Sequence, residues 1–167
     1  MDNIEIVIKD FRKENINSFI YEELRLPALT IKSSHFYDHQ SERDLEFAQV
    51  KNMKKILSPK GTGYVVLEKI LMGIELHNVV MVFSFDEENG DIVINFPENE
   101  IFTGGVKEIK LKVKKILDDL IKLRNRYEIG KIIIGYEPAE DQDTKLIELN
   151  NQEICLEKVF ERIIKGI

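Results

Sequence analysis

Residues 79–97, VVMVFSFDEENGDIVINFP, decide the fold of this chain. Apolar positions alternate on both sides of a central acidic segment, which is the pattern of two strands that each bury one face. The apolar face of the two strands comprises Met81, Phe83, Phe85, Ile92, Ile94 and Phe96. Asn89-Gly90 is a strong hairpin signal, so it places a turn between the strands. Pro97 ends the second strand, because proline has no amide hydrogen to donate to a sheet.

Shorter apolar runs predict further strands on both sides of this hairpin. They are residues 4–8 (IEIVI), 29–36 (LTIKSSHF) and 131–136 (KIIIGY). Residues 64–76 fit either a helix or a strand. We favour a strand for their first half, with a break or bulge near Gly73.

The longest predicted helix spans residues 106–127, because its apolar side chains recur on one face. That stripe comprises Val106, Ile109, Val113, Ile116, Leu117, Leu120, Leu123 and Tyr127. Gly130 suits its C-terminal end. Shorter helices are predicted over residues 13–26, ending before Pro27, and over residues 156–164. Residues 37–60 leave two interpretations open, a helix capped by Ser41 or an irregular excursion.

Strands cluster in the middle of the chain and helices flank them. This order predicts an α+β fold with a mostly antiparallel sheet, a single layer of sheet, and helices packed on one face. The length of 167 residues predicts one globular domain, residues 1–167. The chain shows no secretory signal, and its apolar runs are too short to span a membrane. Its single cysteine, Cys155, fits a reducing compartment. We therefore expect a cytoplasmic protein without membrane contact.

The net charge of −6 comes mainly from two short segments. Residues 86–100 hold six acidic residues and residues 137–143 hold four, without any Lys or Arg. Such acidity repels nucleic acid and attracts basic proteins. We therefore expect a basic protein partner and no nucleic-acid ligand. The candidate partner-binding residues are Asp86, Glu87, Glu88, Asp91, Glu98, Glu100, Glu137, Glu140, Asp141 and Asp143.

Catalytic signals are weak in this sequence. His35, Asp38 and His39 have the residue types of a metal site, but they fall in a segment that reads as a strand end and loop. Residues 60–63 (KGTG) lack the rest of a phosphate-binding loop and read as a turn. Cys155 starts an amphipathic helix, where a core position is expected rather than a nucleophile. We expect no cofactor and no bound metal.

Five lysines gather near the start of the long predicted helix, at positions 107, 110, 112, 114 and 115. They oppose the helix dipole at that end. We interpret them as a solvated helix face, and pairing with the acidic hairpin or another chain is the alternative.

The longer stretch over residues 79–102, VVMVFSFDEENGDIVINFPENEIF, resembles a strand, acidic turn and strand pattern in small immunity proteins of bacterial polymorphic toxin systems. The resemblance implies a small cytoplasmic α+β protein without enzymatic activity, which binds the C-terminal toxin domain of a partner and blocks it. An acidic inhibitor would also associate fast with a basic, nuclease-like toxin. Charge pairs would then surround aromatic anchors such as Phe96 or Phe102.

Two other functions remain open at this point. One is a metal-dependent enzyme that uses His35, Asp38 and His39. The other is a non-catalytic regulatory or structural subunit whose acidic face docks a different basic partner. A toxin-neutralising immunity protein is the first expectation, and the oligomeric state is left undetermined.

Overall fold

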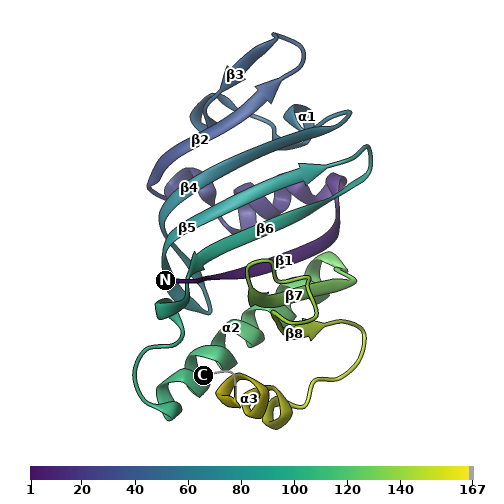
Figure 1. Cartoon of the computed structure of the whole chain (residues 1–167). Coiled ribbons are helices and arrows are strands. Elements are labelled where there is room, and N and C mark those ends of the chain that lie inside the picture. Colours follow the sequence, from purple (N-terminus) through teal and green to yellow (C-terminus); the bar gives the residue numbers. More distant parts are fainter. Residues whose placement is uncertain (166–167) are drawn as a thin grey trace.

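Eight strands form one sheet in the order β3-β2-β4-β5-β6-β1-β7-β8, and the computed structural model describes residues 1–165 (Figure 1). Every neighbouring pair in this part of the chain is antiparallel. The strands are β1 (Asn3–Arg12), β2 (Ile31–Asp38), β3 (Arg43–Leu45), β4 (Gly61–Met72), β5 (Ile74–Phe85), β6 (Asn89–Pro97), β7 (Lys131–Tyr136) and β8 (Lys145–Leu149). The α-helices are α1 (Met53–Ile56), α2 (Val106–Tyr127) and α3 (Leu156–Lys165).

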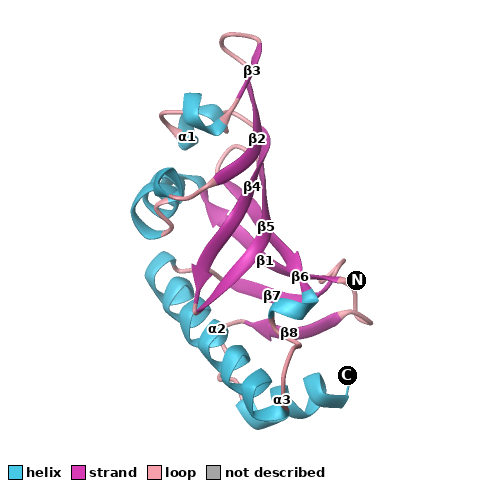
Figure 2. Cartoon of the chain, turned by 90° about the vertical axis from the view of Figure 1, so that its left-hand side faces the viewer, coloured by secondary structure: helices cyan, strands magenta, loops and turns pink. Residues whose placement is uncertain are grey.

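The helices lie on one face of the sheet, as the side view in Figure 2 shows. This confirms the predicted α+β class with its single antiparallel layer. The predicted boundaries of α2 are those of the structure, and its predicted stripe is buried except for Val106. We call the opposite side of the sheet the open face.

Alternation along β5 and β6 fills the core beneath the helices. Met81, Phe83, Ile92 and Ile94 are each 0 % exposed, because residues of one parity in a strand all point to one side. The ring of Phe83 lies 6.0 Å from that of Phe36 in β2. The hairpin that the sequence predicted therefore forms the centre of the core.

The turn of this hairpin is centred two residues earlier than predicted. Asn89 and Gly90 already belong to β6, and residues 86–88 make the turn. The amide of Asp86 donates to the carbonyl of Asn89 at 2.8 Å and closes it. Gly90 serves close packing instead, because a Cβ there would lie 2.2 Å from Cγ of Phe85.

The predicted break at Gly73 is confirmed, and both sides of it are strand. Gly73 links β4 to β5 with a φ of +79°, a conformation that residues with a side chain rarely adopt. A Cβ at this position would also lie 2.2 Å from the carbonyl oxygen of Lys115. The β4–β5 turn therefore packs directly against the backbone of α2.

Residues 37–60 follow the second of the two open interpretations. Ser41 caps no helix, since its hydroxyl donates to the carboxylate of Asp38 at 2.8 Å. The segment contains the short strand β3, a single 3-10 turn (Phe47–Gln49) and α1. Asn52, rather than Ser41, caps the helix that follows by accepting from the amide of Lys55.

Other elements also differ from prediction. The helix expected over residues 13–26 is a 3-10 turn (Lys13–Asn15) followed by a π-helical segment (Ser18–Glu23). Glu128, with a φ of 52°, takes the left-handed position after α2 that was expected near Gly130. Strand β8 was not predicted. No helix among the described residues is both long and apolar enough to cross a membrane.

Candidate functional site

The β5–β6 turn is fixed to β1 by Asp91. Strand β1 has an irregularity between Ile8 and Phe11, and Asp10 there has a φ of 50°. One carboxylate oxygen of Asp91 accepts from the amide of Asp10 at 3.0 Å, and the other accepts from Lys9 Nζ at 2.8 Å. Asp91 is thus engaged within the fold, and it positions the turn next to it.

Lys9 brings the two acidic segments together. Its Nζ lies between Asp91 of the β5–β6 hairpin and Glu140 of the β7–β8 loop, 3.4 Å from the latter. The hydrogen bond with Asp91 raises the pKa of Lys9 above its usual value. Strand β1 lies between β6 and β7 in the sheet, so Lys9 of β1 can reach the acidic segments next to both strands.

The β7–β8 loop folds back over the open face. The amide of Ala139 donates to Oε2 of Glu5 at 2.7 Å, and the Ala139 side chain packs on Val7 and Ile133. All three apolar residues are at most 4 % exposed. The loop therefore covers β1 and β7 on this side, and leaves Asp141 and Asp143 exposed.

Asp86, Glu87 and Glu88 are exposed on a well-supported turn. The amide of Lys13 donates to the carbonyl of Glu88 at 2.8 Å, and Nζ of Lys13 donates to the carbonyl of Pro59 at 2.9 Å. Burial lowers the pKa of Lys13, while Glu87 and Asp86 partly oppose that effect. Since the buried lysine fixes the backbone beneath them, the three carboxylates project from an ordered position.

A polar depression of about 560 Å³ lies beside this turn, and we call it the acidic hollow. It is lined by Asp10, Lys60, Ser84, Asp86, Glu87, Glu88, Asn89, Gly90 and Asp91. Its lining thus contains five carboxylates and a single lysine. Ser84 and Asp91 are paired residues of β5 and β6 on the open face, so the acidic hollow opens toward that face.

Glu98, Glu100 and Glu137 lie apart from the acidic hollow. Strand β6 has nine residues, so Glu98 at its far end is about 27 Å from the turn. The amide of Glu137 donates to Asn3 at 3.2 Å, which places it at that same far end. The ten predicted acids therefore do not form one surface.

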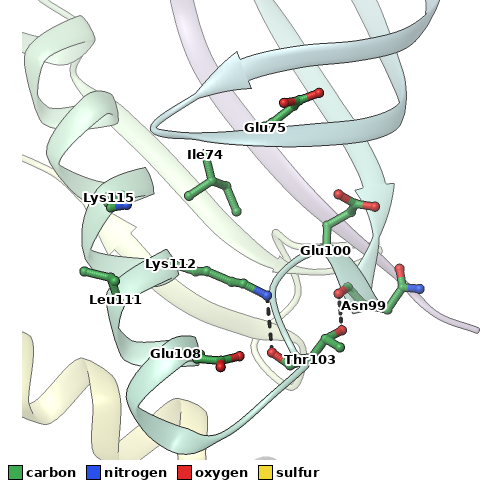
Figure 3. A pocket seen from close by; sticks show the side chains of 9 residues that line it. All are labelled: Ile74, Glu75, Asn99, Glu100, Thr103, Glu108, Leu111, Lys112 and Lys115. Carbon is green, nitrogen blue, oxygen red and sulfur yellow. Dashed lines mark hydrogen bonds between the residues drawn. The ribbon is translucent and has the colours of Figure 1, made fainter.

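Glu100 instead borders a groove of about 610 Å³ between the β4–β5 turn and α2 (Figure 3). Figure 3 shows Lys112 donating to the carbonyl of Thr103 across the groove. Three carboxylates and two lysines share its lining, so its charge is mixed. Just outside it, Nδ1 of His77 lies 3.0 Å from Glu100, which raises the pKa of the histidine.

The proposed metal residues have other partners. Nε2 of His35 lies 3.0 Å from Asp44, and its ring stacks on that of Tyr64. Asp38 accepts hydrogen bonds from Ser41 and Gln40. His39 lies against the ring of Tyr37. Within residues 1–165, no group of three or more His, Cys, Asp or Glu side chains is placed to hold a metal ion.

Two other predicted positions are corrected by the structure. Cys155 is exposed rather than in the core. Phe96 is 1 % exposed, because it is one of the β6 residues whose side chains point into the core. It is therefore unavailable as a partner anchor. Phe102 is partly buried. The outward positions of the same strands were not predicted to bind a partner, although their alternation is visible in the sequence. Among these, Val82 of β5 and Tyr64 of β4 are exposed on the open face.

This structure is an open antiparallel sheet with an acidic hollow at one end of its open face. The sequence matches the model of the PABL017 Cdi1I immunity protein family over residues 2–152. The chain belongs to that family. The prediction of a non-enzymatic immunity protein of a bacterial toxin system is thereby confirmed.

A solved structure supports the fold. The chain is similar to one in the 1.75 Å crystal structure of the toxic C-terminal tip of CdiA from Pseudomonas aeruginosa in complex with immune protein. The TM-score is 0.66 at 16 % identity, and the match covers 90 % of this chain and 96 % of that one. A search of curated proteins found no match.

Proposed function

We propose that this protein neutralises a basic, nuclease-like toxin domain by binding it at the acidic hollow and occluding it. The observation that carries the proposal is that five carboxylates and only one lysine line the acidic hollow. A protein that binds nucleic acid needs a cationic surface, and such a surface complements this one. The toxic tip of CdiA in the P. aeruginosa structure is likewise bound to an immune protein.

The carboxylates act mainly on the rate of encounter. Complementary surface charges raise association rate constants by about 10- to 1000-fold, and salt screens the effect. Asp86, Glu87 and Glu88 are the available charges of the β5–β6 turn, whereas Asp91 and Glu140 are already bound to Lys9. Glu98, Glu100 and Glu137 lie at the far end of the sheet and contribute less.

The test uses the C-terminal domain of the CdiA-like protein that we expect to be encoded immediately upstream. The triple variant Asp86→Asn, Glu87→Gln, Glu88→Gln is expected to associate at least about tenfold more slowly at low salt. The difference should shrink at high salt, because screening weakens attraction between exposed charges. Stopped-flow or surface-based kinetics measure both conditions.

The matched control removes the same charge elsewhere. Glu153, Glu157 and Glu161 are exposed near and along α3, and their three Glu→Gln changes should leave the association rate almost unaltered. Equal slowing in both triple variants would mean that net charge, and not the acidic hollow, drives encounter. A wild-type protein that neither binds this domain nor restores growth of cells expressing it would refute the proposal.

A further inference from the structure

The open face carries a continuous row of side chains that run in register across the sheet. Directly paired residues of neighbouring strands make up this row, from β7 to β2: Ile133, Val7, Val93, Val82, Tyr64 and His35. A second row beside it contains Val80 paired with Val66. Open faces of antiparallel sheets usually present polar side chains to water, so an apolar row here requires an explanation.

One half of this row is covered and the other half is bare. Ile133 and Val7 are 4 % and 2 % exposed beneath Ala139 of the β7–β8 loop. Val82 and Tyr64 continue the same row and are 36 % and 40 % exposed. The protein's own loop thus covers apolar side chains over β1 and β7, and no described segment does so over β5 and β4.

The bare half has the composition of a protein interface. Tyrosine supplies a large contact area while keeping a polar group for hydrogen bonding, and it is enriched at interface centres. Tyr64 is held against His35 with ring centroids 6.0 Å apart. Tyr37 of β2, 40 % exposed, adds a second aromatic ring on the next strand.

The negative charge beside the bare half of the row indicates what kind of protein would bind it. The acidic hollow adjoins this surface, because Ser84 and Asp91 line the acidic hollow and lie in the row next to Val82 and Val93. An apolar centre with an acidic margin fits a protein with a basic margin around an apolar contact. We infer that the toxin domain is anchored on the open face by Tyr64 and Val82, with Tyr37 beside them. This inference rests on the proposed function and names its contact surface.

The apolar anchors and the acidic hollow should affect different rate constants of binding. Anchors in the centre of an interface act chiefly on dissociation, whereas charges at its margin act on association. Tyr64→Ala and Val82→Ser are each expected to weaken binding of the upstream-encoded toxin domain at least tenfold. Their effect should come from faster dissociation and persist at high salt, unlike that of the acidic triple variant.

Two control variants test whether any loss of binding is specific to the open face. Leu111, 53 % exposed on α2 and lining the groove of Figure 3, offers an exposed apolar residue on the other side of the sheet. Leu111→Ser should bind within about twofold of wild type. Tyr64→Phe keeps the ring and should also retain most of the affinity. Circular dichroism and a thermal melt establish that each variant is folded.

The outcomes separate this inference from the proposed function. Weaker binding only in Tyr64→Ala and Val82→Ser supports the open face as the contact surface. Wild-type affinity in both variants, or a loss in Leu111→Ser instead, overturns the inference while the protein still neutralises its toxin. A self-associated wild type that Tyr64→Ala converts to monomers, with toxin binding unaltered, overturns it as well. No binding by the wild type refutes the proposed function itself.

Discussion

The two faces of the sheet differ although the same strands build both. Along β5, Met81 and Phe83 are 0 % exposed beneath the helices, whereas the intervening Val82 is 36 % exposed on the open face. Neighbouring residues of one strand therefore serve different purposes. Stability depends on the helix-covered face, and we propose the open face and the turn at its end as the recognition surface. Substitutions one position apart should separate these two properties.

Phe83→Ala should have the largest effect on stability. Phe83 is completely buried against Phe36, and removing a phenyl ring from a core costs about 3–5 kcal/mol of the free energy of unfolding. Urea unfolding measures the loss. A cost below about 1 kcal/mol would contradict the distinction between the faces.

Gly73→Ala should be the next most costly substitution. A methyl group there meets the carbonyl of Lys115 at a positive φ, which combines backbone strain of about 1–2 kcal/mol with overpacking of about 1–3 kcal/mol. We expect a loss of at least about 2 kcal/mol in the free energy of unfolding. Gly105→Ala is the control, because a Cβ there has no neighbour within 4 Å.

Lys9→Met should release the loop that covers β1 and β7 on the open face. The substitution keeps most of the apolar length of the side chain and removes its bonds to Asp91 and Glu140. Because these groups are partly exposed, we expect about 1 kcal/mol of destabilisation. Faster proteolysis within residues 137–144 is the more specific measurement. Lys131→Met, an exposed lysine on the neighbouring strand, should leave proteolysis unaltered.

Val82→Thr should leave stability within about 0.5 kcal/mol of wild type, as is usual for a surface position. Threonine keeps the β-branched shape that suits a strand. The comparison with Phe83→Ala is direct, because the two positions are adjacent in β5. A loss of several kcal/mol here would mean that the open face also supports the fold.

His77→Gln should have the smallest effect, confined to acidic and neutral pH. Hydrogen bonding to Glu100 raises the pKa of His77 in the folded protein. The protonated histidine therefore stabilises the fold fully below its unfolded pKa of about 6.5, and this contribution is lost as the pH rises through the folded value. Thermal melts should separate wild type from variant below about pH 6 and converge at higher pH. A difference that grows with pH would contradict this assignment.

The accuracy of the sequence-based prediction depended on how local each feature is. Strong alternation in β5 and β6 and the stripe of α2 were readable, because each pattern is contained in one element. The turn was misplaced because Gly90 is required by the ring of Phe85, a contact across the hairpin. Strand β8 was missed because its five residues, KLIEL, follow a polar loop and are only partly apolar.

The site was predictable as two acidic segments but not as a surface. Lys9 brings the two segments together only because β1 lies between β6 and β7. The sequence does not reveal this strand order. The separation of Glu98, Glu100 and Glu137 from the turn follows from the length of β6. The row through Val82 and Tyr64 required the register between strands, because each residue alone is an unremarkable outward position.

The position of β1 between β6 and β7 also affects the order in which the strands pair during folding. Val7 pairs with Val93 on one side and Ile133 on the other. Strand β1 precedes both of these partner strands in the sequence, so it pairs with them only after they have been synthesised. Strands β4, β5 and β6 follow one another closely and have local partners, which favours their early formation. The acidic hollow, which includes Asp10 of β1, and the β7–β8 loop, which Lys9 of β1 holds, would then assemble last. A nascent or truncated chain that lacks β7 would accordingly contain most of the core, but Val7 would lack its cover of Ile133 and Ala139.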